Sequence, residues 1–140
     1  MDATETTRRL THQGVMAMLS AGVVKAEQIG QPQVIVIVDA SGDVLGEIRM
    51  TGSKFLSRRS ALAKALTSAS HGVPSADIPQ AVRPAIAAAT GGSVTGLGGG
   101  LPIVVAGTLI GGIGVGSGSP DQDLAVARAA LEAVGADMPG

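Results

Sequence analysis

A glycine-rich stretch near the C-terminus, GLGGGLPIVVAGTLIGGIGVGSGSP (residues 96–120), most constrains how this chain can fold. It holds ten of the chain's 21 glycines. The alternation of a strand divides its second half, TLIGGIGVG (108–116), into two faces. One face carries Leu109, Gly111, Ile113 and Val115. The other carries Ile110, Gly112, Gly114 and Gly116. Because the second face is nearly bare backbone, we expect a helix or a neighbouring subunit to approach it closely.

The same stretch does not have the pattern of a phosphate-binding loop. Such a loop needs a Lys after its last glycine, and residues 96–140 contain no Lys. The dinucleotide pattern G-x-G-x-x-G also fails, because Ser117 and Leu101 stand where its third glycine should be. The helix expected after the stretch begins with Asp121 and Asp123, which would repel an anion. The glycines therefore indicate close packing.

Hydrophobic periodicity and turn residues predict an α+β fold in a single domain spanning residues 1–140. Helices are expected over 7–28, 54–70 and 75–89, the third interrupted by proline. A fourth helix is expected after Ser119, where the sequence Ser-Pro-Asp-Gln is typical of a capped helix start. Two strand pairs are expected at 33–39 with 44–50 and at 101–107 with 108–116, with a short strand near 94–97. Each pair is a hairpin, so the sheet is expected to be antiparallel.

Composition narrows the partners and the location. Hydrophobic residues make up 45% of the chain and charged residues 15%, so we expect subunit interfaces and a homo-oligomer. A net charge of -1 and a single aromatic residue, Phe55, argue against nucleic acid. No apolar run is long enough to span a membrane, and the first residues do not resemble a signal peptide, so a cytoplasmic location is expected. The absence of Cys excludes thiol chemistry.

Several segments together resemble the GlcG/HbpS family of haem-binding and haem-degrading-like proteins. They are VIVIVDASGDVLGEIRM, RRSALAKALTSA and GGGLPIVVAGTLIGGIGVGSGSPDQDLAVARAAL. The family pattern is a strand ending in V-D-x-x-G, then R-M, a helix with K-A, G-G-x-P-I, a glycine-rich strand and an acidic helix start. Here these features include Asp39, Arg49-Met50, Lys64-Ala65 and the motif Gly99 to Ile103.

The resemblance implies a fold and a class of ligand. The implied fold is a five-stranded antiparallel sheet between helices on both faces, a three-layer arrangement similar to profilin and PAS domains. The implied assembly is a dimer, tetramer or octamer. Some family members bind haem or a corrinoid, so haem is the cofactor that the resemblance implies. Others lie beside catabolic enzymes without an assigned reaction.

Three side chains are the candidates for chemistry: Arg49, Lys64 and His71. Arg49 could bind a carboxylate through two hydrogen bonds, or pair with Glu47. Lys64 lies among alanines, where burial would lower the pKa of its ammonium, although it could instead extend to solvent. His71 could be a general base or a haem ligand, or simply a favourable charge at a helix C-terminus. The expected ligand-binding residues are Arg49, Met50, His71, Gly99 and Gly100.

The remaining polar residues are expected to have structural roles. Asp39 is expected to close the first hairpin turn, and Arg58 and Arg59 to lie on a solvated or interface surface. His12 is expected to have no role in the site. Asp121 and Asp123 are helix-start residues first, with a weak metal site or a catalytic carboxylate as the alternative. Two isolated histidines without a paired ligand spacing do not predict a metal site.

Two functions remain open at this point. The first is a ligand-binding oligomer that holds haem or a related tetrapyrrole through Arg49 and His71. The second is a cofactor-independent isomerase, hydratase or lyase acting on a small carboxylate or carbonyl substrate. In that case Arg49 would bind the carboxylate, and Lys64 or His71 would transfer the proton. A purely structural oligomer is a third alternative.

Overall fold

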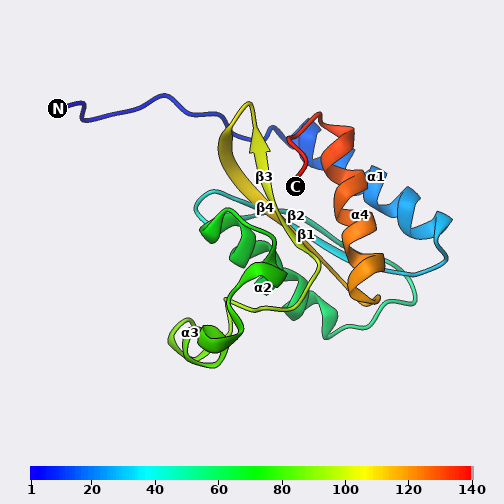
Figure 1. The fold of residues 1–140 in the computed structure, drawn as a ribbon. Coiled ribbons are helices and arrows are strands. Elements are labelled where there is room, and N and C mark those ends of the chain that lie inside the picture. Colours follow the sequence, from blue (N-terminus) through cyan, green and yellow to red (C-terminus); the bar gives the residue numbers. More distant parts are fainter. Residues whose placement is uncertain (140) are drawn as a thin grey trace.

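A computed structural model describes residues 1–139, which fold into helices packed against one antiparallel sheet (Figure 1). The four α-helices are α1 (His12–Gln28), α2 (Ser57–His71), α3 (Arg83–Ala89) and α4 (Pro120–Ala133). The four strands are β1 (Val34–Asp39), β2 (Val44–Arg49), β3 (Gly100–Val105) and β4 (Thr108–Gly116). Two short 3₁₀ turns, η1 (Ser75–Asp77) and η2 (Gln80–Val82), precede α3. This arrangement confirms the predicted α+β class.

The strands lie in the order β2-β1-β4-β3, and all three neighbouring pairs are antiparallel. Both predicted hairpins, β1 with β2 and β3 with β4, are confirmed. The prediction of five strands is wrong, because the described residues form a sheet of four. Residues 94–97 run without strand pairing, and the glycines at 98 and 99 then lead into β3.

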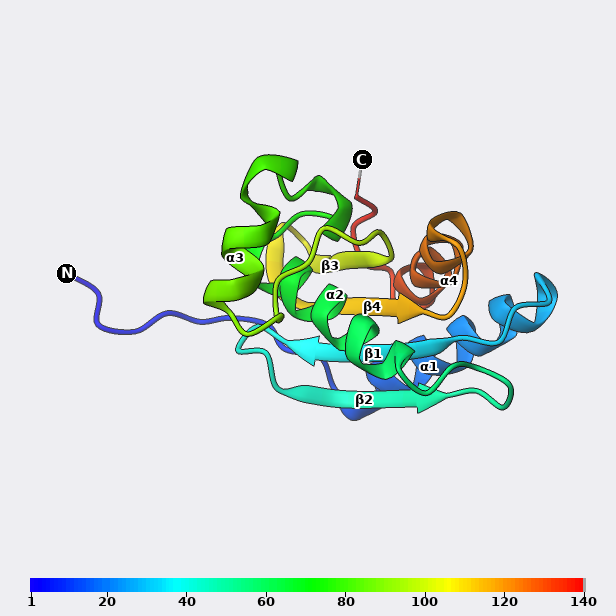
Figure 2. The ribbon, with the colours of Figure 1, turned by 90° about the horizontal axis from the view of Figure 1, so that it is seen from below.

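Helices contact the sheet from two sides (Figure 2). On one face, α2 packs against Val34, Val36 and Val38 of β1 through its alanines. On the other face, α1 and α4 contact each other and cover Ile35 and Ile37 of the same strand. The apolar run Val34–Val38 of β1 follows from this double burial, because both of its faces lie away from water.

The glycines of β4 let α2 approach the sheet closely. A Cβ added at Gly112 or Gly114 would collide with a backbone carbonyl of α2, at Ala65 or Ala61 respectively. A helix of this chain therefore occupies the bare glycine face, as one of the two sequence expectations proposed. Close contact here sets how deeply the side chains of α2 reach toward the far edge of the sheet.

The predicted assignment of β4 side chains to faces is wrong at its first two apolar positions. The register between β3 and β4 shifts beside Ile103, so that Ile110 and Gly111 together stand opposite a single partner. This bulge moves Ile110 into the core with Ile113 and Val115. Leu109 lies on the α2 side instead, 3.6 Å from the Cβ position of Gly72.

Helix boundaries differ from the periodicity at three places. The first helix begins at His12 and not near residue 7, because the Thr11 side chain accepts a hydrogen bond from the Gly14 amide and caps it. The second begins at Ser57, after a turn at 54–56. The stretch 75–89 divides into η1, η2 and α3 at its prolines. The predicted capping box of α4 is present in full, with Ser119 and Gln122 bonding each other's backbone.

Candidate functional site

A buried ion pair joins α2 to α4 beside Gly99, at the start of β3. The Lys64 side chain is 6% exposed and that of Asp123 is 3% exposed. The Lys64 ammonium donates to Asp123 Oδ2 at 3.2 Å and to the carbonyl of Val115 at 2.8 Å. The other oxygen of Asp123, Oδ1, accepts from the Gly118 amide at 3.0 Å. From the sequence, burial of the Lys64 stem was one of two alternatives, the other being extension to solvent, and Asp123 was given only a minor role.

Burial raises the pKa of the Asp123 carboxyl above its ordinary value of 3.8. Four weaker effects lower this pKa without outweighing burial. They are the positive charge of Lys64, its hydrogen bond to the carboxylate, the backbone N–H of Gly118 and the side-chain amide of Gln33. A raised carboxyl pKa beside a buried ammonium is typical of sites that bind a ligand or move a proton.

Gly99 and Gly100 lie directly against this pair. A Cβ at Gly99 would stand 3.1 Å from Lys64 Nζ and 2.6 Å from the Val115 carbonyl, and the residue has a φ of +121°. The Gly100 amide donates to the Ser75 hydroxyl at 2.9 Å, so Ser75 anchors the loop. The predicted residues Lys64, Gly99 and Gly100 are thus brought together, with Asp123 and Ser75 as additional members.

Beside the ion pair, a hollow of about 300 Å³ opens between the start of α2 and the turn after β4. We call it the Ser117 hollow. Its lining consists of Lys54, Ser57, Ser60, Lys64, Leu97, Gly98, Ser117, Gly118, Pro120 and Asp123. Ser117 holds a φ of +88°, a conformation that costs a non-glycine residue about 1–3 kcal/mol. Its hydroxyl accepts from the Lys54 amide at 2.9 Å and donates to Ser57 Oγ at 2.8 Å.

Arg49 and Met50 have different surroundings from each other. Arg49 is exposed at the end of β2. Among the described residues, its side chain forms no hydrogen bond or ion pair. The expected alternative partner, Glu47, pairs with Arg58 at 2.7 Å instead. Met50 is half-buried against the core, and its sulfur accepts a hydrogen bond from the backbone N–H of Gln33 at 3.4 Å. Arg49 is therefore free for a ligand, whereas Met50 serves packing.

His71 is exposed at the last position of α2. Its Nδ1 lies 3.2 Å from the Thr67 carbonyl, and because a carbonyl only accepts, Nδ1 carries the hydrogen. The lone pair of the neutral ring is then on Nε2. A ring oriented in this way is the usual arrangement of a metal-binding histidine.

Arg49 and His71 lie at opposite ends of the sheet. Arg49 pairs with Val34 where β1 begins, while His71 is followed by Gly72, which touches Leu109 near the start of β4. Because β1 and β4 are antiparallel, these positions are separated by about 20 Å, the length of a six-residue strand. One chain does not bring the two side chains into a single pocket.

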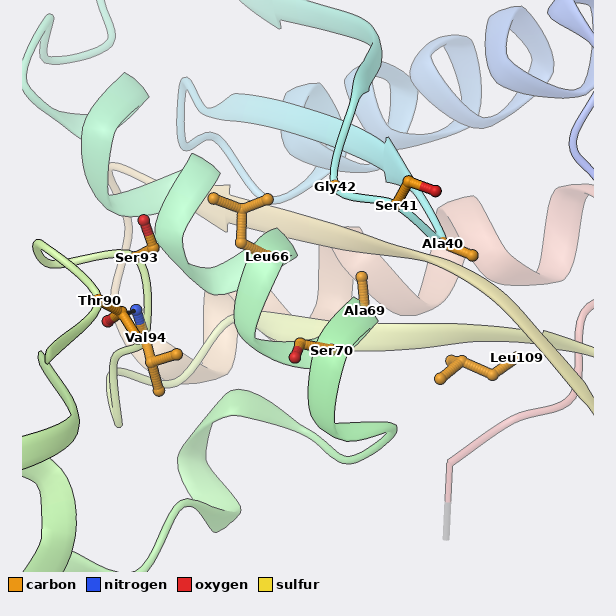
Figure 3. A pocket seen from close by; sticks show the side chains of 10 residues that line it. All are labelled: Ala40, Ser41, Gly42, Leu66, Ala69, Ser70, Thr90, Ser93, Val94 and Leu109. Carbon is orange, nitrogen blue, oxygen red and sulfur yellow. Dashed lines mark hydrogen bonds between the residues drawn. The ribbon is translucent and has the colours of Figure 1, made fainter.

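A second hollow, of about 600 Å³, lies at the His71 end of α2 (Figure 3). We call it the Leu109 hollow. It is lined by Ala40, Ser41, Gly42, Leu66, Ala69, Ser70, Thr90, Ser93, Val94 and Leu109. Leu66 and Ala69 point into it from α2, with hydroxyl groups at its rim. None of these lining side chains is a ligand that haem iron commonly uses.

The other candidates have the structural roles expected of them. Asp39 Oδ1 accepts from the amides of Ser41 and Asp43 and closes the β1–β2 turn. His12 is exposed at the start of α1.

Within residues 1–139, no three His, Asp or Glu side chains gather as a metal site. Over the same residues, no helix combines the length and the apolar character needed to cross a membrane.

Comparison with known proteins decides the family. The model of the family described as haem degrading protein HbpS-like matches residues 10–132. The chain belongs to the HbpS-like family. The resemblance found in the sequence motifs is thereby confirmed.

Two proteins with similar sequences come from Citrobacter freundii. The corrinoid adenosyltransferase PduO is 34% identical over 130 residues, which cover 89% of this chain and 39% of PduO. The chain therefore spans about two fifths of that relative. An uncharacterized 15.0 kDa protein encoded between dhaT and dhaS is 31% identical and is matched over 96% of its length.

Solved structures of similar fold include haem-related proteins. Klebsiella pneumoniae ORFY superposes with a TM-score of 0.91 at 27% identity, covering 96% of this chain and 97% of that one. A PduOC:haem complex gives a TM-score of 0.87 at 28% identity, covering 95% of this chain and 100% of that one. HbpS itself gives 0.81 at 29% identity, with 93% of both chains covered.

Proposed function

We propose that this protein binds haem, or a related tetrapyrrole, with His71 as the metal ligand. The observation that carries the proposal is the state of His71: the side chain is exposed, Nδ1 is fixed on the Thr67 carbonyl, and the Nε2 lone pair faces away from that bond. The similarity to the PduOC:haem complex over nearly the whole chain supports the same ligand class. Bound iron would supply ligand exchange and electron transfer.

The residues of the chain fit a haem held at the surface better than one enclosed in a monomer. The Leu109 hollow lies at the His71 end of α2 and offers apolar contact through Leu66, Ala69 and Leu109. It contains no iron ligand of its own, so His71, the chain neighbour of the lining residue Ser70, would have to supply one. Arg49 is available for a propionate, but only from another copy of the chain.

This geometry favours a homo-oligomer, from dimer to octamer, as the functional form. A charged content of only 15% leaves much apolar surface. The edge strand β2 exposes Val44, Leu45 and Ile48. In such an assembly, Arg49 of one subunit could lie near His71 of another. A cytoplasmic location remains the prediction for this assembly.

The acid–base enzyme considered from the sequence has less support. It needs Arg49 to hold a substrate while Lys64 or His71 transfers a proton. Within one chain, Arg49 and His71 lie at opposite ends of the sheet, and the Lys64 ammonium is occupied by Asp123 and a carbonyl. We therefore retain ligand binding as the function.

A haemin titration tests the proposal. The wild-type protein should give a saturable Soret band at one haem per subunit or per pair of subunits, and the mass of the assembly should be followed in parallel. His71→Ala should lose most of the band, because no other lone pair replaces Nε2. Arg49→Ala should weaken haem binding about tenfold or more, the worth of a charge-assisted hydrogen bond.

Matched controls are available for both variants. His12→Ala removes the other histidine, and Arg128→Ala removes another exposed arginine; both should bind like the wild type. Weak, non-saturating absorbance in the wild type, or a band that His71→Ala leaves unchanged, would contradict the proposal.

A further inference from the structure

We propose that the Ser117 hollow is a second binding site, for a small carboxylate anion, formed by Lys54, Ser57 and Lys64. It is separate from the proposed haem site, because it lies at the first turn of α2 whereas His71 is the last residue of that helix. Haem binding and carboxylate binding can therefore fail independently of each other.

The buried ion pair at the base of the hollow is the first support. Taking both charges of Lys64 and Asp123 out of water costs more than their mutual attraction commonly returns, and apolar residues would pack there equally well. Lys64 directs two of its three ammonium hydrogens to Val115 and Asp123. The third has no acceptor among the described residues and is available to a bound anion.

Two further donors border the hollow. The Ser57 hydroxyl accepts a hydrogen bond from Ser117, and its own hydrogen finds no acceptor in residues 1–139. Lys54 is exposed at the rim and forms no ion pair within the same residues. Together with Lys64 and Asp123, the lining carries two positive charges and one negative charge, so it favours an anion.

The backbone around the hollow is held open for close approach. Gly98 and Gly118 contribute no side chains to the lining. A Cβ at Gly118 would stand 2.7 Å from the side-chain nitrogen of Gln33 and 2.8 Å from Asp123 Oδ1, so a larger residue would displace these two buried side chains. Ser117 is kept in a left-handed conformation by its bonds to Lys54 and Ser57. Strain of this kind gathers at ligand-binding sites.

A buried amide oxygen without a partner is an independent sign of a missing ligand. Gln33 is 0% exposed, and its Oε1 has no hydrogen-bond partner among the described residues, whereas its Nε2 faces the Asp123 carboxylate. Such a group is costly unless a ligand or an ordered water completes it. It lies beside Asp123 and Gly118, both of which line the hollow.

Size selects the ligand class. About 300 Å³ is at the lower end of ligand pockets and suits an acid of a few carbons. Lys54, Ser57 and Lys64 supply donors around the hollow, and a carboxylate accepts several hydrogen bonds at once. A short organic acid with one carboxylate fits both the charge and the volume.

Titrations followed by NMR test this inference. Acetate, pyruvate and inorganic phosphate are added separately at constant ionic strength, and the ¹H–¹⁵N signals of Gly98 and Gly118 are recorded. We expect acetate or pyruvate to give saturating shifts. Lys54→Ala and Ser57→Ala should each weaken that binding about tenfold, since each removes one bond to the anion.

The controls replace the same residue types elsewhere. Lys25→Ala and Ser20→Ala both lie on α1, away from both hollows, so both should bind the acids like the wild type. All four variants should keep the haemin band. Absence of saturation by either acid, tighter binding of phosphate, or equal binding by Lys54→Ala and Ser57→Ala would each overturn the carboxylate site while leaving the haem proposal intact.

Discussion

Lys64 and Asp123 depend on each other because neither charge is solvated. Replacing Lys64 with Met leaves a buried carboxylate without its partner. We expect Lys64→Met to lower the free energy of unfolding by about 3–5 kcal/mol, as found when one member of a buried pair is removed. Urea unfolding followed by circular dichroism measures this loss.

The matched double variant separates the pair's charge from its position. Lys64→Met with Asp123→Leu removes both buried charges while keeping apolar volume at each site. Its free energy of unfolding should return to within about 1–2 kcal/mol of the wild type, or exceed it. If the double variant is as unstable as Lys64→Met alone, packing and not charge explains the loss.

The raised pKa of Asp123 makes stability depend on pH. In the folded chain the carboxyl retains its proton above 3.8, where the unfolded chain has lost it. Its contribution to stability is therefore present below 3.8 and is lost as pH rises through the higher folded value. Across that window, the free energy of unfolding of Asp123→Asn should rise relative to the wild type.

Asp121→Asn provides the control for this pH profile, because Asp121 is exposed on the same first turn of α4. Its stability should follow the wild-type profile. A constant difference between Asp123→Asn and the wild type at every pH would show that burial does not raise the pKa of Asp123.

At this scale the sequence predicted some contacts and not others. The Asp39 turn follows from local spacing, whereas the small neighbours of Lys64 left both burial and extension to solvent open. The bond between Lys64 and Asp123 joins residues 59 positions apart, so no local pattern indicates it. The unpartnered Oε1 of Gln33 likewise became evident only in the folded chain.

At the scale of elements, the contact of β4 with α2 depends on glycine at 112 and 114. Gly114→Ala would place a methyl group against the Ala61 carbonyl, a backbone atom that cannot move aside. We expect a loss of about 1–3 kcal/mol or more in the free energy of unfolding, from overpacking. Thermal unfolding followed by circular dichroism measures it.

Gly14→Ala is the control for this substitution. It lies within α1, and its added Cβ would meet Thr11 Oγ1 at an ordinary 3.5 Å. Alanine there should stabilise the protein by about 0.5–1 kcal/mol through helix propensity. Equal effects at the two positions would show that the glycine face is not a tight contact.

The elements themselves were largely predictable because their signals are local. Alternation, the Asp39 turn and the Ser119 capping box place the hairpins and α4. The faces on which Leu109 and Ile110 lie were not predictable, because the bulge at these residues arises from pairing with β3. The start of α1 was placed too early because the N-cap Thr11, and not the apolar pattern, determines where the helix begins.

At the scale of the whole molecule, the order of motifs was sufficient to indicate the family, although each motif alone was weak. The number of strands was not predictable from that resemblance, since residues 94–97 have the composition of a strand but find no partner. The distance between Arg49 and His71 was also hidden, because strand order and direction determine it. It is this distance that directs the haem proposal to an assembly of copies.

The most direct test of haem binding through His71 is electron paramagnetic resonance of the ferric haem complex. The wild type and His12→Ala should show the same signature of an imidazole-ligated iron, since Nε2 of His71 supplies the ligand in both. His71→Ala should lose that signature even where some haem remains bound. An unchanged spectrum in His71→Ala, or the absence of imidazole ligation in the wild type, would contradict the account.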